Sequence, residues 1–310
     1  MRLCGSHAIM NEYSIDEPRA RRAFERAAPT YLAAARLERE VGARMLERLA
    51  LVRLEPGVMV DAGAGPGPQA EGLRARYPHA LYVALDASLA MLRERRARSS
   101  WIQRMFAGRF SDAVCADMRS IPLAAGSCGL VWSNMALHWM SDPLPALGEF
   151  SRVLRPEGLL MFSTLGPDTL KELRAAWEAA GAGPQAHRFR DMHDLGDMLA
   201  GSGFSSPVMD MEIITLSFAS IAALVSDLRA TGQSSSASGR RRTLTGKRRW
   251  AAVRDMLECR AVDGRHSFTA EVVYGHAWKG TPKRAPDGSS IVRFQRAPRS
   301  SRSAKICASG

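Results

Sequence analysis

The sequence lacks several features that define common protein classes. It has no uninterrupted stretch of roughly 18 apolar residues, the length that a membrane-spanning helix needs, so we expect no membrane span. Its first residues lack the apolar core of a secretory signal. Its five cysteines are scattered and contain no C-x-x-C pair, which predicts neither disulfides nor a zinc site and fits the reducing cytoplasm. A G-K-[ST] triplet is also absent, which excludes a P-loop that grips phosphates.

What is present describes an ordinary globular protein with an excess of positive charge. Apolar residues make up 46% of the 310 positions and charged residues 24%, so the chain can bury a substantial core. The formal net charge is +12, with basic runs in GRRRTLTGKRR (239–249) and in the tail QRAPRSSRSAKICASG (295–310). Two interpretations remain open: solvated basic faces, or a surface that attracts an acidic macromolecule. No RNA-binding module accompanies the charge, so we expect no nucleic-acid partner.

The order of predicted elements indicates an α/β fold built on a doubly wound, parallel sheet. Short apolar runs predict five strands, and helical patterns separate most of them. These strands are 57–63, 80–86, 112–118, 128–134 and 158–166. Beyond them, alternating stretches predict two further strands, at 207–218 and 269–280, and helices at 191–204 and 220–232. The serine-rich segment 234–239 is predicted to be a flexible break.

We expect one domain with loose ends. Residues 1–20 are predicted to be a flexible N-terminus and residues 297–310 a disordered basic tail. Between them, residues 21–296 are expected to form a single domain. It would comprise N-terminal helices at 21–56, a ligand-binding half at 57–166 and a substrate-side half at 167–296.

The first predicted strand ends in a glycine-rich loop, Asp61-Ala-Gly63-Ala-Gly65-Pro-Gly67. Glycine lets the backbone turn sharply and approach a ligand that a β-carbon would block. The spacing is G-x-G-x-G rather than the G-x-G-x-x-G of dinucleotide sites, and Pro66 and Pro68 remove two backbone N–H groups that a pyrophosphate would need. The loop is therefore poorly equipped to bind phosphates.

Carboxylates follow three successive predicted strands. Asp61 can meet the amino group of an amino-acid moiety, and Asp86 stands where a carboxylate accepts both hydroxyls of a ribose. Asp117 offers an acceptor for an adenine amino group, and Met118 offers an apolar edge for the ring. A ribose, an adenine and an amino acid without phosphates describe S-adenosylmethionine. The alternative for Asp86 alone is that it caps the helix that begins near Ser88.

These segments resemble the class I S-adenosylmethionine-dependent methyltransferases. The resemblance is carried by DAGAGPG, LDAS, ADMRSIPL and SNMALHWMSDPLPALGEFSRVLRPEGLLMFSTLG, in order and at the family's spacing across residues 58–166. It implies a Rossmann-like, seven-stranded, mostly parallel sheet with an antiparallel last strand, N-terminal helices and a helical insertion. It also implies that the cofactor is bound by Asp61, Gly63, Gly65, Gly67, Asp86, Asp117, Met118 and Asn134.

A narrower resemblance covers residues 20–294. The segments FERAAPTYLAAARLEREVGARMLERL (24–49), SNMALHW, FSTLGPDTLKELRAAW, DMHDLGDMLAGSGF, DLRATGQ and EVVYGHAW are similar to the malonyl-[acyl-carrier protein] O-methyltransferases of biotin synthesis, the BioC type. This resemblance implies methyl transfer from S-adenosylmethionine to the free carboxylate of malonyl-acyl carrier protein or malonyl-CoA. A carboxylate is already ionised at neutral pH, so the reaction needs no general base, and the enzyme mainly aligns the reacting atoms.

Three residues are candidates for the surroundings of the reacting atoms. His138 and Trp139 follow the fourth predicted strand at the carboxyl edge of the sheet, where ligands bind. Trp139 would line the methyl-transfer site and Tyr31 would close over the cofactor, and each is also compatible with a structural aromatic. His138 is compatible with catalysis and with a buried polar residue held by its neighbours. The sequence does not choose a clamp for the substrate carboxylate among Arg174, Arg188 and Arg229.

The resemblance implies that the partner is an acidic acyl carrier protein that carries the malonyl group. A basic surface would steer that encounter. We expect a monomer without a metal site. Two alternatives stay open, because BioC-like proteins with segments such as DMHDLG and DLRATG include arginine hydroxylases and assembly factors. No iron site can be assigned among His187, His193, His266 and His276.

Overall fold

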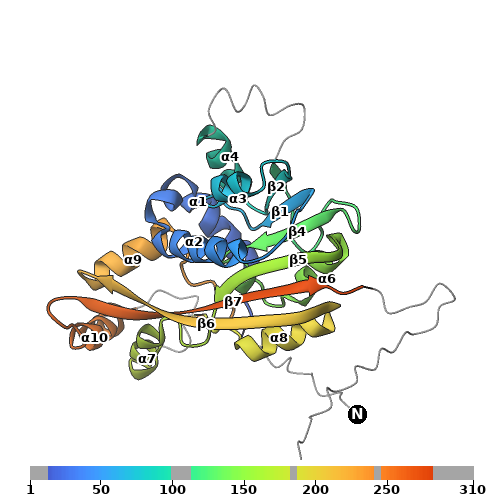
Figure 1. The fold of residues 1–310 in the computed structure, drawn as a ribbon. Helices are drawn as coiled ribbons and strands as arrows, with labels where there is room; N and C mark the ends of the chain where they lie inside the picture. The colour runs from blue at the N-terminus through green and yellow to red at the C-terminus, as the bar shows by residue number, and fades with distance from the viewer. Residues whose placement is uncertain (1–12, 99–112, 182–186, 241–245, 282–310) are drawn as a thin grey trace, which may run out of the picture. The chain divides into compact units, whose positions relative to one another are not determined.

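The computed structural model describes residues 13–98, 113–181, 187–240 and 246–281. All but the last of these residues belong to one compact unit that ends at Gly280 (Figure 1). The helices are α1 (Glu17–Ala34), α2 (Arg36–Ala50), α3 (Ala70–Arg76), α4 (Leu89–Arg98), η1 (Leu137–Trp139), α6 (Leu144–Val153), α7 (Lys171–Ala179), α8 (Met192–Gly201), α9 (Ile221–Ala230) and α10 (Lys247–Glu258). The strands are β1 (Val58–Ala62), β2 (Leu81–Asp86), β3 (Ala113–Cys115), β4 (Cys128–Ser133), β5 (Leu154–Leu165), β6 (Phe204–Phe218) and β7 (His266–Lys279).

The start of this unit differs from the predicted N-terminal boundary. Helix α1 begins at Glu17, inside the segment 1–20 that the sequence predicts to be flexible. Asp16 caps it, because its carboxylate accepts a hydrogen bond from the backbone N–H of Arg19 at 3.1 Å. At the other end, the predicted boundary at residue 296 lies outside the described residues, the last of which is 281. The predicted disordered tail, 297–310, lies outside the described residues.

The strands form a single sheet in the order β3-β2-β1-β4-β5-β7-β6. β1 runs parallel to both β2 and β4, and β3 and β5 extend this parallel part on either side. β7 lies between β5 and β6 and runs antiparallel to both. This topology confirms the predicted fold class. It also brings the carboxyl ends of β1, β2 and β4 to one edge of the sheet.

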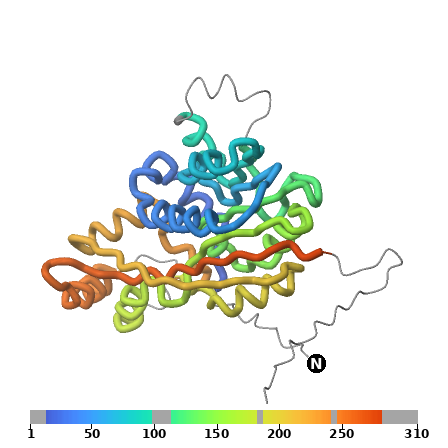
Figure 2. The backbone as a smooth tube through the Cα atoms, in the orientation of Figure 1, coloured from blue at the N-terminus to red at the C-terminus, as the bar shows by residue number. Residues whose placement is uncertain are grey.

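Alternate residues of the central strands face two different hydrophobic cores. Met59 and Leu130 share one core with side chains of α2 and α3. Their neighbours Val60 and Val131 share the other core with side chains of α6 and α8. Figure 2 shows the N-terminal helices in blue beside the strands, although α1 and α2 precede the whole sheet in the chain. The parallel part of the sheet is therefore covered on both faces, as its nearly continuous apolar strands predict.

A third hydrophobic core lies beyond the parallel strands. Helices α7, α9 and α10 pack there with Phe268 of β7, and Trp177 lies 5.7 Å from Trp250, between ring centres. Helix α10 was not predicted, since its first turn lies in the basic run 239–249. In the described ranges, no helix combines the length and the apolarity that crossing a bilayer requires.

The prediction of a flexible break at 234–239 is wrong. Ser236 is fully buried, and its carbonyl accepts a hydrogen bond from the backbone N–H of Asp16 at 2.7 Å. Two residues later, the N–H of Ser238 donates to the carbonyl of Ser14 at 2.9 Å. The segment is thus paired with the chain that leads into α1. Its composition is that of a linker, but its hydrogen bonds make it part of the fold.

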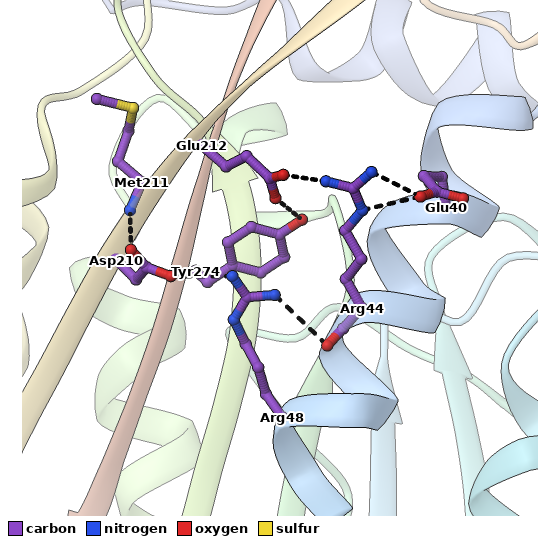
Figure 3. Close-up of polar contacts among 7 residues, drawn as sticks. All are labelled: Glu40, Arg44, Arg48, Asp210, Met211, Glu212 and Tyr274. Carbon is purple, nitrogen blue, oxygen red and sulfur yellow. Dashed lines mark hydrogen bonds and ion pairs between the residues drawn. The ribbon is translucent and has the colours of Figure 1, made fainter.

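Helix α2 is joined to the antiparallel strands by arginines (Figure 3). Arg44 forms an ion pair with Glu212 of β6, and Arg48 pairs with Asp210 of the same strand at 2.9 Å. The guanidinium of Arg48 also lies 3.9 Å from the ring centre of Tyr274, a residue of β7. These side chains are partly exposed, so each pair contributes little to stability alone. Together they orient α2 across the sheet.

A glycine lets α2 approach α3 closely. Gly42 lies in the middle of α2, where glycine costs about 1 kcal/mol relative to alanine. A β-carbon at this position would come within 2.1 Å of the Gln69 amide nitrogen. The side chain of Gln69 is buried, and that nitrogen donates to the carbonyl of Glu38 at 3.2 Å. The close packing of Gln69 against α2 therefore requires glycine at position 42.

We predict that Gly42→Ala destabilises the protein by about 1–2 kcal/mol, because the new methyl group displaces Gln69 and breaks its hydrogen bond. The matched control is Gly148→Ala in α6, where a β-carbon meets nothing within 4 Å. That variant should gain up to about 1 kcal/mol from helix propensity. Urea unfolding measures both changes. Stabilisation by both substitutions would show that α2 and α3 are not in close contact.

Candidate active site

The carboxyl ends of β1, β2 and β4 border a cavity of about 280 Å³, which we call the cofactor cavity. Eight predicted site residues line it: Tyr31, Gly63, Gly65, Asp86, Asp117, Met118, Asn134 and Trp139. The predicted residues Asp61, Gly67 and His138 do not line it. Helix α1 contributes Glu17, Arg21 and Phe24, which the sequence analysis did not select. Sequence alone does not place these residues at the cavity, because they approach the loop only through the folding of α1.

The three loop glycines serve different purposes. All have positive φ, which β-carbons disfavour, at +77° for Gly63, +54° for Gly65 and +76° for Gly67. A β-carbon at Gly63 would lie 2.4 Å from the β-carbon of Ala136, and one at Gly67 would lie 2.9 Å from Arg95. A β-carbon at Gly65 would meet nothing within 4 Å, although Gly65 lines the cavity. Gly65 therefore leaves room where a ligand can approach the backbone.

Asp86 fixes the loop and also lines the cavity. One carboxylate oxygen accepts the N–H of Gly65 at 2.8 Å, and the other accepts the N–H of Ser88 at 2.7 Å. Burial raises the pKa of Asp86, and these two hydrogen bonds counteract that rise. The capping interpretation and the ligand interpretation are compatible here, because each oxygen retains a second acceptor site for a ribose hydroxyl.

Asp61 lies behind the glycine loop rather than on the cavity wall. It is 3% exposed, and its carboxylate accepts a hydrogen bond from the Tyr82 hydroxyl. Burial raises its pKa to about 6, against the opposing effects of the Tyr82 hydrogen bond and the positive charge of Arg95. Contact with the amino group of a ligand therefore stays a prediction for this residue.

Asp117 is already paired in this structure. Its carboxylate accepts two N–H groups of the Arg119 guanidinium, at 2.6 and 3.1 Å, and this interaction lowers its pKa. Arg119 also pairs with Glu17 of α1 at 2.9 Å. All three residues line the cofactor cavity. Arg119 thus links the third strand to α1, a link that the ADMRS motif alone does not reveal.

Asn134 lines the cavity and is held by hydrogen bonds to α2 and β5. Its amide nitrogen donates to the carbonyl of Glu38 at 2.8 Å, and its oxygen accepts the Ser163 hydroxyl at 2.7 Å. The next residue, Met135, has a positive φ of 54°, and its N–H donates to the carbonyl of Ser163 at 3.1 Å. The end of β4 is therefore held in one strained conformation by α2 and β5.

The two aromatic candidates after β4 have different surroundings. Trp139 lines the cofactor cavity, and its ring packs edge-on against Phe24 at 4.9 Å. His138 does not line that cavity, is buried, and lies 3.4 Å from the Thr164 hydroxyl through Nδ1. Burial, together with nearby His187, lowers its pKa to about 3, so the ring is neutral. These contacts favour a positioning role for His138 rather than contact with a ligand.

A second cavity of about 200 Å³ shares Trp139 with the cofactor cavity. We call it the second cavity. Its polar and charged lining consists of Arg36, Glu38, Thr169, His187, Thr215, Ser217, Asp227 and Gln233. The remaining lining is mostly leucine and phenylalanine. No sequence motif predicts this cavity, because its residues come from segments that are far apart in the chain.

None of the three arginines proposed as a carboxylate clamp lines the second cavity. The guanidinium of Arg174 donates to the carbonyls of Pro167 and Thr169. Arg188 borders a small, separate cavity beside His138, and Arg229 lies exposed on α9. Within the described residues, no three His, Cys, Asp or Glu side chains cluster where they could bind a metal ion.

Glu38 connects the two cavities. Its backbone carbonyl accepts the side-chain amides of Gln69 and Asn134, and its carboxyl group accepts that of Gln233. The residue is 3% exposed, and burial raises its pKa to about 7. The folded protein thus binds this proton more tightly than the unfolded chain does. Glu38 therefore favours folding at low pH, and that contribution is lost as the pH rises from about 4.5 to about 7.

We predict that Glu38→Gln becomes progressively more stable than the wild type as the pH rises. The difference in free energy of unfolding should grow by on the order of 2 kcal/mol between about pH 5 and pH 8, because glutamine never has to ionise in this buried position. Urea unfolding at four pH values measures it. Glu47→Gln, an exposed position on α2, serves as the matched control. A pH-independent difference would show that the buried carboxyl group titrates normally.

Comparison with known proteins agrees with this geometry. A family model described as a methyltransferase domain matches residues 60–162. The YcgJ protein of Bacillus subtilis has a similar fold, with a TM-score of 0.54 and 16% identity over 78% of this chain and 99% of that chain.

Two curated relatives are similar over nearly their full length. The malonyl-[acyl-carrier protein] O-methyltransferase of Gallionella capsiferriformans (strain ES-2) is 47% identical over 92% of this chain and 98% of the relative. The protein of the same name from Methylovorus sp. (strain MP688) is 49% identical over 94% and 98%. These matches confirm the predicted class, an S-adenosylmethionine-dependent O-methyltransferase. The chain belongs to the malonyl-[acyl-carrier protein] O-methyltransferase family.

Proposed function

We propose that this protein methylates the free carboxylate of a malonyl group carried on acyl carrier protein, an early step of biotin synthesis. The methyl donor is S-adenosylmethionine. The observation that carries the proposal is the pair of cavities with Trp139 in common: one is bordered by the glycine loop and Asp86, and the other has a largely apolar lining. Two ligands can therefore meet at Trp139. The names of the relatives supply the substrate class for this arrangement.

The residues of the cofactor cavity fit S-adenosylmethionine. The open space at Gly65 accepts a ligand close to the backbone, and Asp86 offers acceptors for ribose hydroxyls. Met91 and Met118 give part of the wall an apolar character that suits an adenine ring. When bound there, S-adenosylmethionine supplies a methyl group on a positively charged sulfur.

The chain itself has little proton chemistry to perform. The substrate carboxylate is ionised at neutral pH, so no side chain has to remove a proton. Tyr31 keeps its phenolic proton, because burial and the charges of Glu38 and Asp86 raise its pKa well above the ordinary value. The contribution of the protein is to exclude water and to hold the two ligands in line, and Phe24, Tyr31 and Trp139 are placed to do so.

The carrier protein is part of the proposal. A net charge of +12 on this chain favours an encounter with an acidic carrier, and such steering weakens as salt is added. We propose further that the enzyme acts as a monomer.

The deciding experiment supplies radiolabelled S-adenosylmethionine together with malonyl-acyl carrier protein, malonyl-CoA or acetyl-acyl carrier protein. The two malonyl thioesters should acquire an alkali-labile methyl ester, and the acetyl thioester should not, because it has no free carboxylate. Transfer to neither malonyl compound, with S-adenosylmethionine bound, would instead favour arginine hydroxylation or a non-catalytic assembly role. Hydroxylation of an arginine-containing protein in the presence of iron would then separate these two alternatives.

We predict that Asp86→Ala weakens binding of S-adenosylhomocysteine by about 2–3 kcal/mol, since buried ribose hydroxyls lose a charged acceptor. This corresponds to roughly a 30- to 150-fold rise in Kd, which calorimetry measures. Asp210→Ala serves as the control, because Asp210 lies 60% exposed on β6. Unchanged affinity in Asp86→Ala would remove Asp86 from the cofactor site.

A further inference from the structure

His187 is held in one protonation state by its neighbours. The backbone N–H of Ser236 donates to Nε2 at 2.6 Å, so Nε2 acts as an acceptor and has no hydrogen. Burial lowers the pKa of the ring to about 4, which makes it neutral at physiological pH. A neutral imidazole whose Nε2 accepts must have its hydrogen on Nδ1. His187 is therefore a hydrogen-bond donor of defined direction.

The position of this donor makes it relevant to the second cavity. His187 lines the cavity and packs edge-on against Trp139, with the ring centres 5.0 Å apart and the planes at 80°. Trp139 is the residue that the two cavities share. Among the described residues, no side chain or backbone group forms a hydrogen bond with Nδ1. His187 thus lines the second cavity beside the residue that the two cavities share, and no described group engages its donor.

The other charged groups of the second cavity largely offset one another. Arg36 is its only cationic side chain among the described residues, and it lies exposed at the start of α2. Burial raises the pKa of Asp227, and the nearby charge of Arg36 counteracts that rise, so these two form an opposite pair. Glu38 holds its proton up to about neutral pH. Of the polar residues in the lining, His187 is the one whose ring packs directly against Trp139.

We infer that the second cavity binds the acyl group and that the Nδ1 hydrogen of His187 donates to one oxygen of its free carboxylate. This inference rests on the proposed function, since it assigns a residue to the substrate of that reaction. The second carboxylate oxygen then remains free to attack. The leucine and phenylalanine side chains of the cavity surround the short chain between carboxylate and thioester.

A neutral donor suits this reaction better than a cation does. As the oxygen bonds to the methyl carbon and the carbon–sulfur bond breaks, the electron pair moves to sulfur, and both the negative and the positive charge disappear. A full positive charge beside the carboxylate would stabilise the reactant more than the transition state and would slow the transfer. A neutral imidazole orients the carboxylate with a smaller penalty. This gives a physical reason why the site has no buried arginine among its described residues.

Two substitutions of His187 separate its donor from its acceptor. His187→Gln can keep an acceptor for the Ser236 N–H but loses the donor at the Nδ1 position. His187→Asn keeps a donor near Nδ1 but loses that acceptor. Each protein, saturated with S-adenosylhomocysteine, is titrated with malonyl-acyl carrier protein and with acetyl-acyl carrier protein. His187→Gln should weaken binding of the malonyl form by about 10- to 100-fold and leave the acetyl form unchanged, because only the malonyl form has a carboxylate.

The controls distinguish a binding role from a structural one. His187→Asn should lose less malonyl affinity than His187→Gln, although it should have the lower melting temperature. S-adenosylhomocysteine affinity should stay within twofold in both variants, since His187 does not line the cofactor cavity. His193→Gln, 80% exposed on α8, should match the wild type throughout. Wild-type affinity of His187→Gln for malonyl-acyl carrier protein would overturn the inference. A strong loss of that affinity in Arg36→Gln alone would assign the carboxylate to Arg36 instead.

A measurement on the wild type keeps the inference testable if the His187 variants do not fold. Nitrogen-15 NMR of the histidine rings should show His187 with a hydrogen on Nδ1 and none on Nε2. The Nδ1 resonance should move on binding of malonyl-carrier protein and not of acetyl-carrier protein. A hydrogen on Nε2, or no response to the malonyl form, would overturn the assignment. Failure of the wild type to methylate any malonyl thioester would instead refute the proposed function.

Discussion

The arrangement of both cavities depends on one backbone carbonyl, that of Glu38. It accepts side-chain amides from Gln69, beside α3, and from Asn134, at the end of β4. These two bonds fix the start of α2 over the carboxyl edge of the sheet. Helix α1, which precedes α2 with a single residue between them, is thereby placed so that Phe24 and Tyr31 reach the cofactor cavity. A sheet edge that would otherwise be open to water becomes a partly enclosed site.

The parts of the site that the sequence predicts are those that local chemistry determines. The glycine loop, Asp86 and Met118 follow apolar strands at short range, so strand periodicity places them at one edge without any knowledge of tertiary contacts. Asp61 shares the same motif, but its partner Tyr82 comes from the neighbouring strand, and only the β1–β2 register brings the two together. The prediction for Asp61 therefore locates the residue correctly at the strand end without revealing what it contacts.

The second cavity could not be predicted for a related reason. Arg36, His187 and Gln233 meet there from three distant parts of the chain. The state of His187 depends on a backbone N–H of Ser236, 49 residues away, in a segment whose composition is typical of a flexible linker. A serine-rich composition indicates low intrinsic order. It cannot indicate that the segment will pair with the chain that leads into α1. The same limit applied to the arginines, because Arg174 is engaged by nearby backbone carbonyls rather than by the cavity.

The pairing of Ser14 with Ser238 has a consequence for how the protein is made. The two hydroxyls are hydrogen-bonded although 224 residues separate them. Ser14 leaves the ribosome early, and it cannot pair with Ser238 until most of the chain has been synthesised. Closing so large a loop carries an entropic cost that short-range contacts do not have. The parallel strands β1 to β5 are complete at Leu165 and can assemble during translation, whereas the backbone N–H of Ser236, which fixes the tautomer of His187, is synthesised later. The part of the second cavity that depends on His187 is therefore completed only after the parallel strands have been synthesised.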